Sequence, residues 1–94
     1  MSVQVLLPSA LGDVTGGARH VDLDLPTGAT VADVMAALGE RFPRLAARLC
    51  DEAGALRRFV NVYVDGSDVR GDGGLATGVA DGAVVHVLPS IAGG

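Results

Sequence analysis

The chain has 94 residues, 49% of them hydrophobic and 19% charged, which predicts a single globular domain. Its formal net charge is −4 and its seven basic residues are all arginine, so lysine-dependent chemistry is excluded and nucleic acid is not expected as a partner. The single cysteine, the absence of a signal-peptide pattern and the absence of a long apolar run favour a cytoplasmic protein without a membrane contact.

Alternating apolar residues predict two strands in the first part of the chain. Residues 3–7 alternate loosely, and residues 20–25 alternate cleanly between apolar and polar side chains. Such a period of two is typical of strands with one buried and one wet face. The glycine-rich residues 12–17 predict a turn or loop, so the two strands are expected to form a hairpin.

The next part of the chain is predicted to be helical. Thr30 suits an N-cap, and Asp33 stands three residues later, the spacing of a capping box. Apolar residues then recur at helical spacing as far as Leu38. Pro43 disfavours helix at the residue before it, so we expect a break there and a second short helix over residues 43–50.

A second hairpin and a last strand are expected in the remainder of the domain. Residues 57–70 alternate around Asp65-Gly66, a pair that suits a type I′ turn. Residues 71–82 are irregular, and residues 83–89 predict the final strand.

This order predicts an α+β fold of two layers, with one main helix and a short second helix covering one face of a mixed sheet of about five strands. A β-grasp arrangement satisfies it most economically, with the apolar first and last strands in the centre. We expect residues 1–89 to form this domain and residues 90–94 to form a flexible tail.

The outward side chains of the predicted strands form a candidate surface for binding another protein. Several of them are large and apolar although no second layer is expected to cover them, which is typical of an interaction site. We call this expected set the docking patch, and its members are Leu6, Phe59, Tyr63, His86 and Leu88.

No pattern in the domain predicts catalysis. His20 and His86 have no cysteine or second histidine at metal-ligand spacing, so no metal site is expected. Cys50 is expected to pack as a small hydrophobic residue, because no basic residue that would activate a thiolate stands beside it in sequence. Asp22 and Asp24 fit the wet face of a strand. The protein is therefore expected not to be an enzyme and to bind no cofactor.

The last two residues, Gly93 and Gly94, suggest a different kind of functional group. Glycine-rich ends often only fray. Here, however, the short and partly apolar segment before them suits docking, and glycine can pass through a narrow channel in conformations that other residues avoid. The carboxylate of Gly94 is then the expected reactive group. Since a carboxylate is a poor electrophile, another enzyme would have to activate it.

The C-terminal third, with "RRFVNVYVDGSDVR", "GGLATGVADGAVVHVLP" and "SIAGG", resembles the MoaD/ThiS family of ubiquitin-like sulfur carrier proteins. Within that family it is most similar to carriers of actinobacterial cysteine biosynthesis. The resemblance implies a β-grasp fold and an activating enzyme, an adenylyltransferase and sulfurtransferase, that uses ATP to convert the Gly94 carboxylate to a thiocarboxylate. It also implies that Ile91, Ala92 and Gly93 insert into partners. Those partners would be a PLP-dependent cysteine synthase and a metal-dependent protease.

Three alternatives stay open at this point. The chain could be the small subunit of molybdopterin synthase, with the tail inserted into the large subunit. It could be a ubiquitin-like modifier that is joined to other proteins through Gly94. It could also be an interaction module whose terminal glycines have no chemical role.

Overall fold

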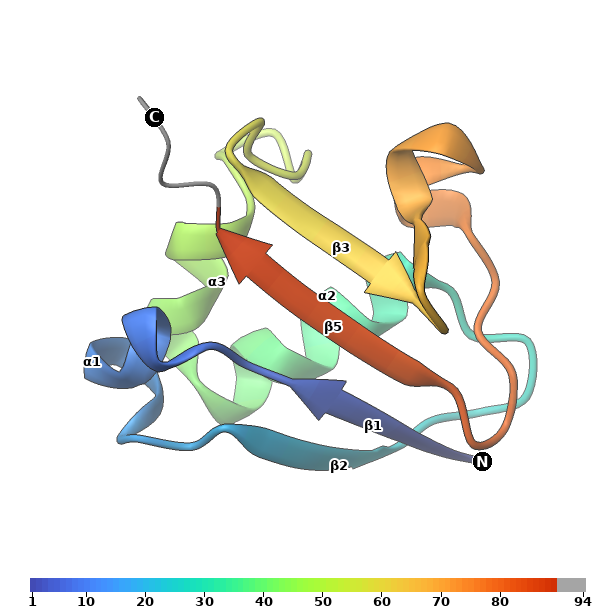
Figure 1. The fold of residues 1–94 in the computed structure, drawn as a ribbon, viewed down its shortest axis with the longest axis horizontal. Helices are drawn as coiled ribbons and strands as arrows, with labels where there is room; N and C mark the ends of the chain where they lie inside the picture. Colours follow the sequence, from blue (N-terminus) through green and yellow to red (C-terminus); the bar gives the residue numbers. More distant parts are fainter. Residues whose placement is uncertain (90–94) are drawn as a thin grey trace.

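The structure is a computed structural model that describes residues 1–89 (Figure 1). Its strands are β1 (Ser2–Leu6), β2 (His20–Asp24), β3 (Val60–Val64), β4 (Ser67–Asp68) and β5 (Val84–Pro89). Its α-helices are α1 (Gly12–Thr15), α2 (Val31–Arg41) and α3 (Pro43–Leu49). Short 3₁₀ turns cover Ser9–Leu11, Val69–Gly71 and Gly74–Ala76.

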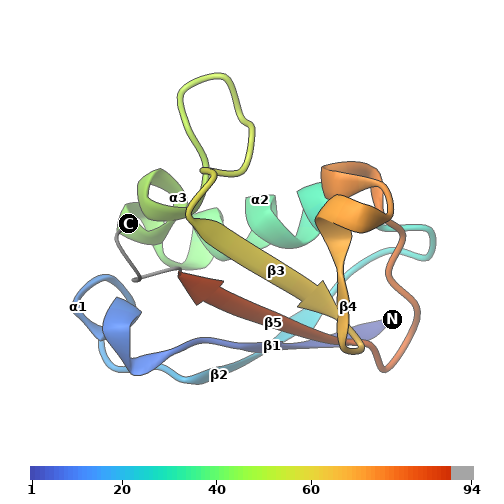
Figure 2. The ribbon, with the colours of Figure 1, turned by 45° about the horizontal axis from the view of Figure 1, so that its top comes forward.

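The strands form one mixed sheet in the order β2-β1-β5-β3-β4. β1 and β5 are parallel, and the other neighbouring pairs are antiparallel. Helices α2 and α3 lie behind the sheet in both ribbon views, so one face of the sheet carries the helical layer (Figures 1 and 2). The predicted two-layer α+β fold, with the first and last strands beside each other in the interior of the sheet, is confirmed.

The inner face of the sheet is built almost entirely from valine. Val5 on β1 pairs with Val21 on β2 and with Val85 on β5, and Val62 on β3 pairs with Val87 on β5. All five side chains are at most 2% exposed. The apolar stripes of the two helices complete the core with Val31, Val34, Met35, Leu38, Leu45 and Leu49.

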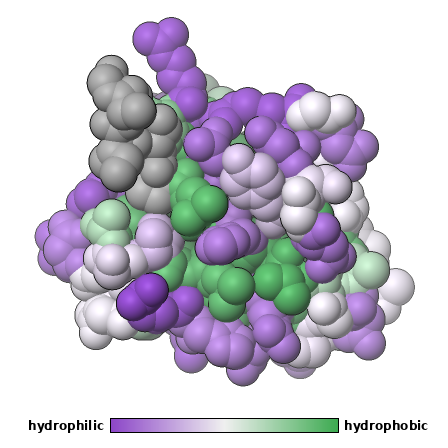
Figure 3. All heavy atoms as spheres, viewed as in Figure 1, coloured by the Kyte–Doolittle hydropathy of each residue, from purple (hydrophilic) through white to green (hydrophobic). Residues whose placement is uncertain are grey.

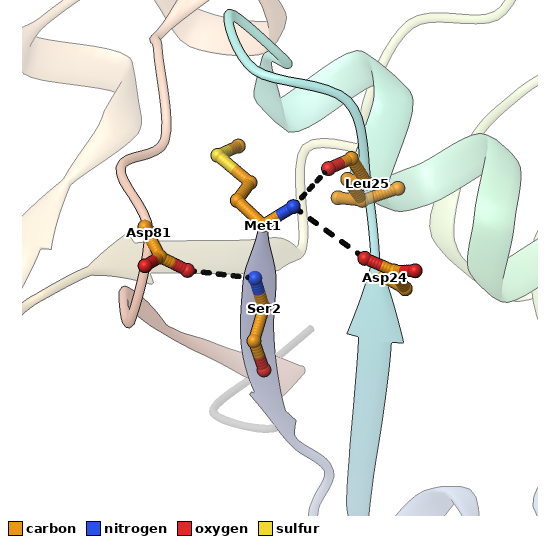
Figure 4. A network of polar contacts seen from close by, with 5 residues as sticks. All are labelled: Met1, Ser2, Asp24, Leu25 and Asp81. Atoms are coloured by element: carbon orange, nitrogen blue, oxygen red, sulfur yellow. Dashed lines mark hydrogen bonds and ion pairs between the residues drawn. The ribbon is translucent and has the colours of Figure 1, made fainter.

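A tight turn and a group of hydrogen bonds at the N-terminus lie at the end of the sheet where β5 begins. Asp65 and Gly66 have φ angles of 49° and 89°, which fits the predicted type I′ turn. The amino group of Met1 donates to the carbonyl oxygen of Leu25 at 2.7 Å, and the Ser2 amide donates to Asp81 at 2.8 Å (Figure 4). These contacts hold the start of β1 between β2 and the turn that leads into β5.

The expectation of a loop over residues 12–17 is wrong. Gly12–Thr15 forms the short helix α1, with Val14 and Thr15 buried. Gly16 (φ 64°) and Gly17 (φ 88°) follow it in the left-handed region, where glycine commonly ends a helix. The glycines that favoured a turn therefore mark the end of a helix, and Val14 of that helix packs in the core.

Helix α2 begins with the predicted capping box. The Thr30 backbone amide donates to Asp33 Oδ2 at 2.8 Å, and the Thr30 hydroxyl lies 3.3 Å from the same oxygen. The carboxylate thus satisfies a backbone donor at the point where an α-helix leaves its first amides without partners.

We predict that Asp33→Ala lowers the free energy of unfolding by about 1 kcal/mol, because the Thr30 amide loses its acceptor. Urea denaturation followed by circular dichroism measures the change. Glu40→Ala, an exposed acidic position on the same helix, is the matched control and should change stability by less than about 0.5 kcal/mol. Equal effects of the two substitutions would contradict this role for the capping box.

Candidate functional site

The outer face of the sheet, on the side away from α2 and α3, carries a row of side chains that crosses all the strands. The strand pairing sets Leu6 of β1 beside His20 of β2 and His86 of β5, and sets Tyr63 of β3 beside His86 and Asp68 of β4. Because side chains alternate between faces, all five project from the side opposite the valine core.

Shorter rows flank this one along the strands. Val84 of β5 lies beside Gln4 of β1, and Leu88 of β5 lies beside Asn61 of β3. Leu6, Tyr63, Val84 and Leu88 are half-buried, whereas His86 is exposed. Apolar patches therefore lie in the middle part of this face, interrupted by hydrophilic residues and surrounded by others (Figure 3).

The structure brings four members of the docking patch together and places the fifth differently. Leu6, Tyr63, His86 and Leu88 share the outer face. Phe59 was expected to be a strand residue, but β3 begins only at Val60. Phe59 lies just before the strand and is 46% exposed, at the end of the sheet where Pro89 pairs with Val60.

β5 leads the chain from the middle of this face to the end of the sheet beside α3 (Figures 1 and 2). Leu88 is its last outward residue with a described side chain, and Pro89 ends the strand. The predicted tail residues Ile91, Ala92, Gly93 and Gly94 lie outside the described residues.

Charged side chains at the β2 edge and on the β3 side of the outer face make different polar contacts. On β2, His20 Nε2 lies 3.2 Å from Asp22, and both side chains are exposed. Arg41, at the end of α2, donates to the backbone carbonyl oxygen of Asp22 at 3.2 Å. On the β3 side, Arg70 donates to Asn61 Oδ1 at 3.0 Å and to the backbone carbonyl oxygen of Arg57 at 2.8 Å. Arg70 was not among the predicted site residues, because nothing in its local sequence pattern indicates which groups its side chain contacts.

Cys50 lies in the helical layer, away from the outer face. It is half-buried and lines a pocket of about 260 Å³ together with Met35, Leu49 and Leu75. Burial raises the pKa of its thiol, the neighbouring Asp51 raises it further, and Arg57 opposes the change. The thiol is therefore protonated and poorly nucleophilic at neutral pH, in keeping with the predicted packing role.

Residues 1–89 contain no group of three or more histidine, cysteine, aspartate or glutamate residues that could hold a metal ion. Over the same residues, no helix is both long enough and apolar enough to cross a membrane.

Comparisons with known proteins agree with this geometry. The model of the ThiS family matches residues 5–94. The sulfur carrier protein CysO of Mycobacterium tuberculosis is 43% identical over 96 residues, and the match covers 100% of both chains. Small archaeal modifier protein 3 of Haloferax volcanii is 41% identical over 78 residues, which cover 83% of this chain and 84% of that protein.

A similar fold is found in the crystal structure of the BexX/CysO complex of Amycolatopsis orientalis. The TM-score is 0.84 at 41% sequence identity, and the match covers 98% of this chain and 99% of that one. The sheet order, the single helical layer and the matched sequence are thus those of a ubiquitin-like β-grasp protein, and the chain belongs to the ThiS family.

Proposed function

We propose that this protein is a sulfur carrier of cysteine biosynthesis, in which the carboxylate of Gly94 is adenylated and then converted to a thiocarboxylate that donates sulfur. The observation that carries the proposal is the 43% identity to CysO along the whole length of both chains. This similarity spans the folded domain together with residues 90–94, where the reactive group would be.

The described domain supports a carrier role because its parts suit recognition better than catalysis. Its outer face carries apolar patches with hydrophilic residues between and around them, and exposed apolar patches are common at protein-binding sites. β5 contributes His86 and Leu88 to that face and ends at Pro89, five residues before Gly94 in the sequence. A partner that covers the face would therefore also receive the tail.

The proposed activation proceeds in two steps on the partner. An oxygen of the Gly94 carboxylate attacks the α-phosphorus of ATP, pyrophosphate leaves, and an acyl adenylate remains. Sulfide then attacks the acyl carbon, and AMP leaves the thiocarboxylate behind. If the terminal sulfur of an enzyme persulfide attacks instead, AMP leaves an acyl disulfide, and a second thiol of the enzyme cleaves this bond, forming an enzyme disulfide and releasing the thiocarboxylate. ATP belongs to the activating enzyme, and this chain acts as its protein substrate.

The lack of a Cβ atom at Gly93 and Gly94 would let both steps occur in a narrow channel. Ile91, Ala92 and Gly93 would form the arm that enters that channel, while the docking patch identifies the carrier. The next partner would be a PLP-dependent cysteine synthase, followed by a metal-dependent protease that releases the product. The protein would contact all of these partners in the cytoplasm. Its single cysteine fits that reducing compartment, because a chain with one cysteine cannot form an internal disulfide.

A second function is favoured by the 41% identity to small archaeal modifier protein 3. A modifier would use the same adenylated carboxylate, but the amine of a lysine on another protein would displace AMP and form an isopeptide bond. The two functions share the activation step and differ in the nucleophile.

We predict that the purified protein, incubated with ATP, sulfide and an adenylating enzyme that loads CysO, exchanges one oxygen for one sulfur. Intact mass spectrometry measures the exchange. The protein lacking Gly93 and Gly94 is the control and should keep its mass. A wild-type protein that never gains sulfur would refute the carrier function, whereas adducts with cellular proteins in an expression host would support a modifier.

We predict that Tyr63→Ala raises the KM for this protein in the same loading assay by about tenfold, because interface aromatic residues often dominate binding. The melting temperature should change little, since the ring lies on the outer face and not in the core. Glu40→Ala, on the helical layer, should leave KM unchanged. Wild-type KM for the Tyr63 variant would exclude this face as the docking surface.

A further inference from the structure

Arg70 presents a positive charge that the fold holds in place at the margin of the outer face. Its side chain is exposed, yet two of its guanidinium nitrogens are fixed, one by Asn61 Oδ1 at 3.0 Å and one by the Arg57 carbonyl oxygen at 2.8 Å. Its backbone amide donates in addition to Asp68 Oδ1 at 2.9 Å. Backbone and side chain are thus both anchored, although the residue lies in a short 3₁₀ turn outside the sheet.

The guanidinium of Arg70 forms no ion pair within the described part of the chain. The ion pairs among residues 1–89 join Met1 to Asp24, His20 to Asp22 and Arg48 to Asp13, and none includes Arg70. Both acceptors of the Arg70 side chain are uncharged oxygens. A guanidinium has five N–H donors, so donors stay available for a further partner.

The position of Arg70 connects it to the tail. Asn61, which holds the guanidinium, lies beside Leu88, and Pro89 ends the strand immediately afterwards. Asp22 and Asp24 are on β2, at the opposite edge of the sheet. The rim of the face therefore carries carboxylates at the β2 edge and Asp68 at the β4 edge, and the fixed cation of Arg70 lies beside Asn61, the partner of Leu88.

We propose that Arg70 is a specificity-determining residue of the docking surface and that it receives an aspartate or glutamate carboxylate of the enzyme that loads the tail. This inference rests on the proposed function and adds the chemistry of the partner. The enzyme would present an apolar centre to Leu6, Tyr63 and Leu88, with a carboxylate beside the channel that admits the tail.

Two physical arguments favour a carboxylate on Arg70. An arginine loses much side-chain freedom when it is held in one place, and here the fold has already imposed that loss before the partner arrives. Burial of an unpaired cation under an interface is costly, so a partner without a negative group at this point would be disfavoured. The same residue would thus strengthen the correct complex and fix its orientation.

The test compares Arg70→Glu with Arg44→Glu in the loading assay that contains the CysO-activating enzyme, ATP and sulfide. Both residues are exposed arginines and both substitutions change the net charge equally, but Arg44 is on α3 in the helical layer. We expect Arg70→Glu to raise KM about tenfold or more at unchanged kcat, and Arg44→Glu to stay within about twofold of wild type. Arg70→Lys should fall between, because lysine keeps the charge without the planar fork.

Arg70 also connects its turn to β3, so its substitution could weaken the fold. Circular dichroism of each variant therefore distinguishes weaker binding from loss of the fold. If Arg70→Glu is unfolded, Asn61→Ala takes its place: the charge remains but one anchor is removed, and KM should rise at an unchanged melting temperature. Replacement of the opposing enzyme carboxylate by arginine should restore loading of Arg70→Glu.

Equal KM for wild type and a folded Arg70 variant, with sulfur gained by both, overturns the inference alone. Equal increases in KM for Arg70→Glu and Arg44→Glu also overturn it, because they reflect net charge only. A wild-type protein that gains no sulfur refutes the proposed function itself.

Discussion

The parallel pairing of β1 with β5 is the contact on which the other features of this structure depend. It joins two segments from opposite ends of the described chain, with Val5 opposite Val85 at the centre of the core. A parallel pair cannot be closed by a tight turn, so the long connection between the two strands must carry the remaining elements. That connection supplies β2 on one side, β3 and β4 on the other, and the helices that cover the inner face.

β5 serves the core and the outer face at once because its side chains alternate. Val85 and Val87 are completely buried, while His86 and Leu88 project to the other side. Burial of each valine contributes roughly 1.5 to 3 kcal/mol, so a slip of the strand by one residue would be strongly unfavourable. The stability of the core therefore also fixes which residues of β5 lie on the outer face, and Pro89 ends the strand at one end of the sheet.

The charged residues around the outer face add orientation to this apolar surface. Asp22 and Asp24 lie at the β2 edge, whereas the other edge combines Asp68 of β4 with the anchored guanidinium of Arg70, so the two edges differ. The one thiol of the chain lies in the helical layer, where burial raises its pKa. The proposed reactive group, the carboxylate of Gly94, belongs to the residues that follow this domain in the sequence.

Sequence alone determined the elements whose signals are local. Alternation defined the strands, the Thr30 and Asp33 pair defined the start of α2, and Pro43 defined the break before α3. The prediction of a loop at α1 was wrong, because a short helix that ends in left-handed glycines has the same composition as a turn. Alternation also indicated which side chains of the strands face outward, but it could not exclude Phe59 from β3.

Tertiary structure decided which outward residues become neighbours. Leu6, His86 and Tyr63 come from three strands that are distant in sequence, and only the register of their pairing places them in one row. The position of Arg70 was decided in the same way, since its acceptors belong to Asn61 and Arg57. A local pattern can specify the face of a strand, whereas the partners of a side chain depend on long-range pairing that exists only after the chain has folded.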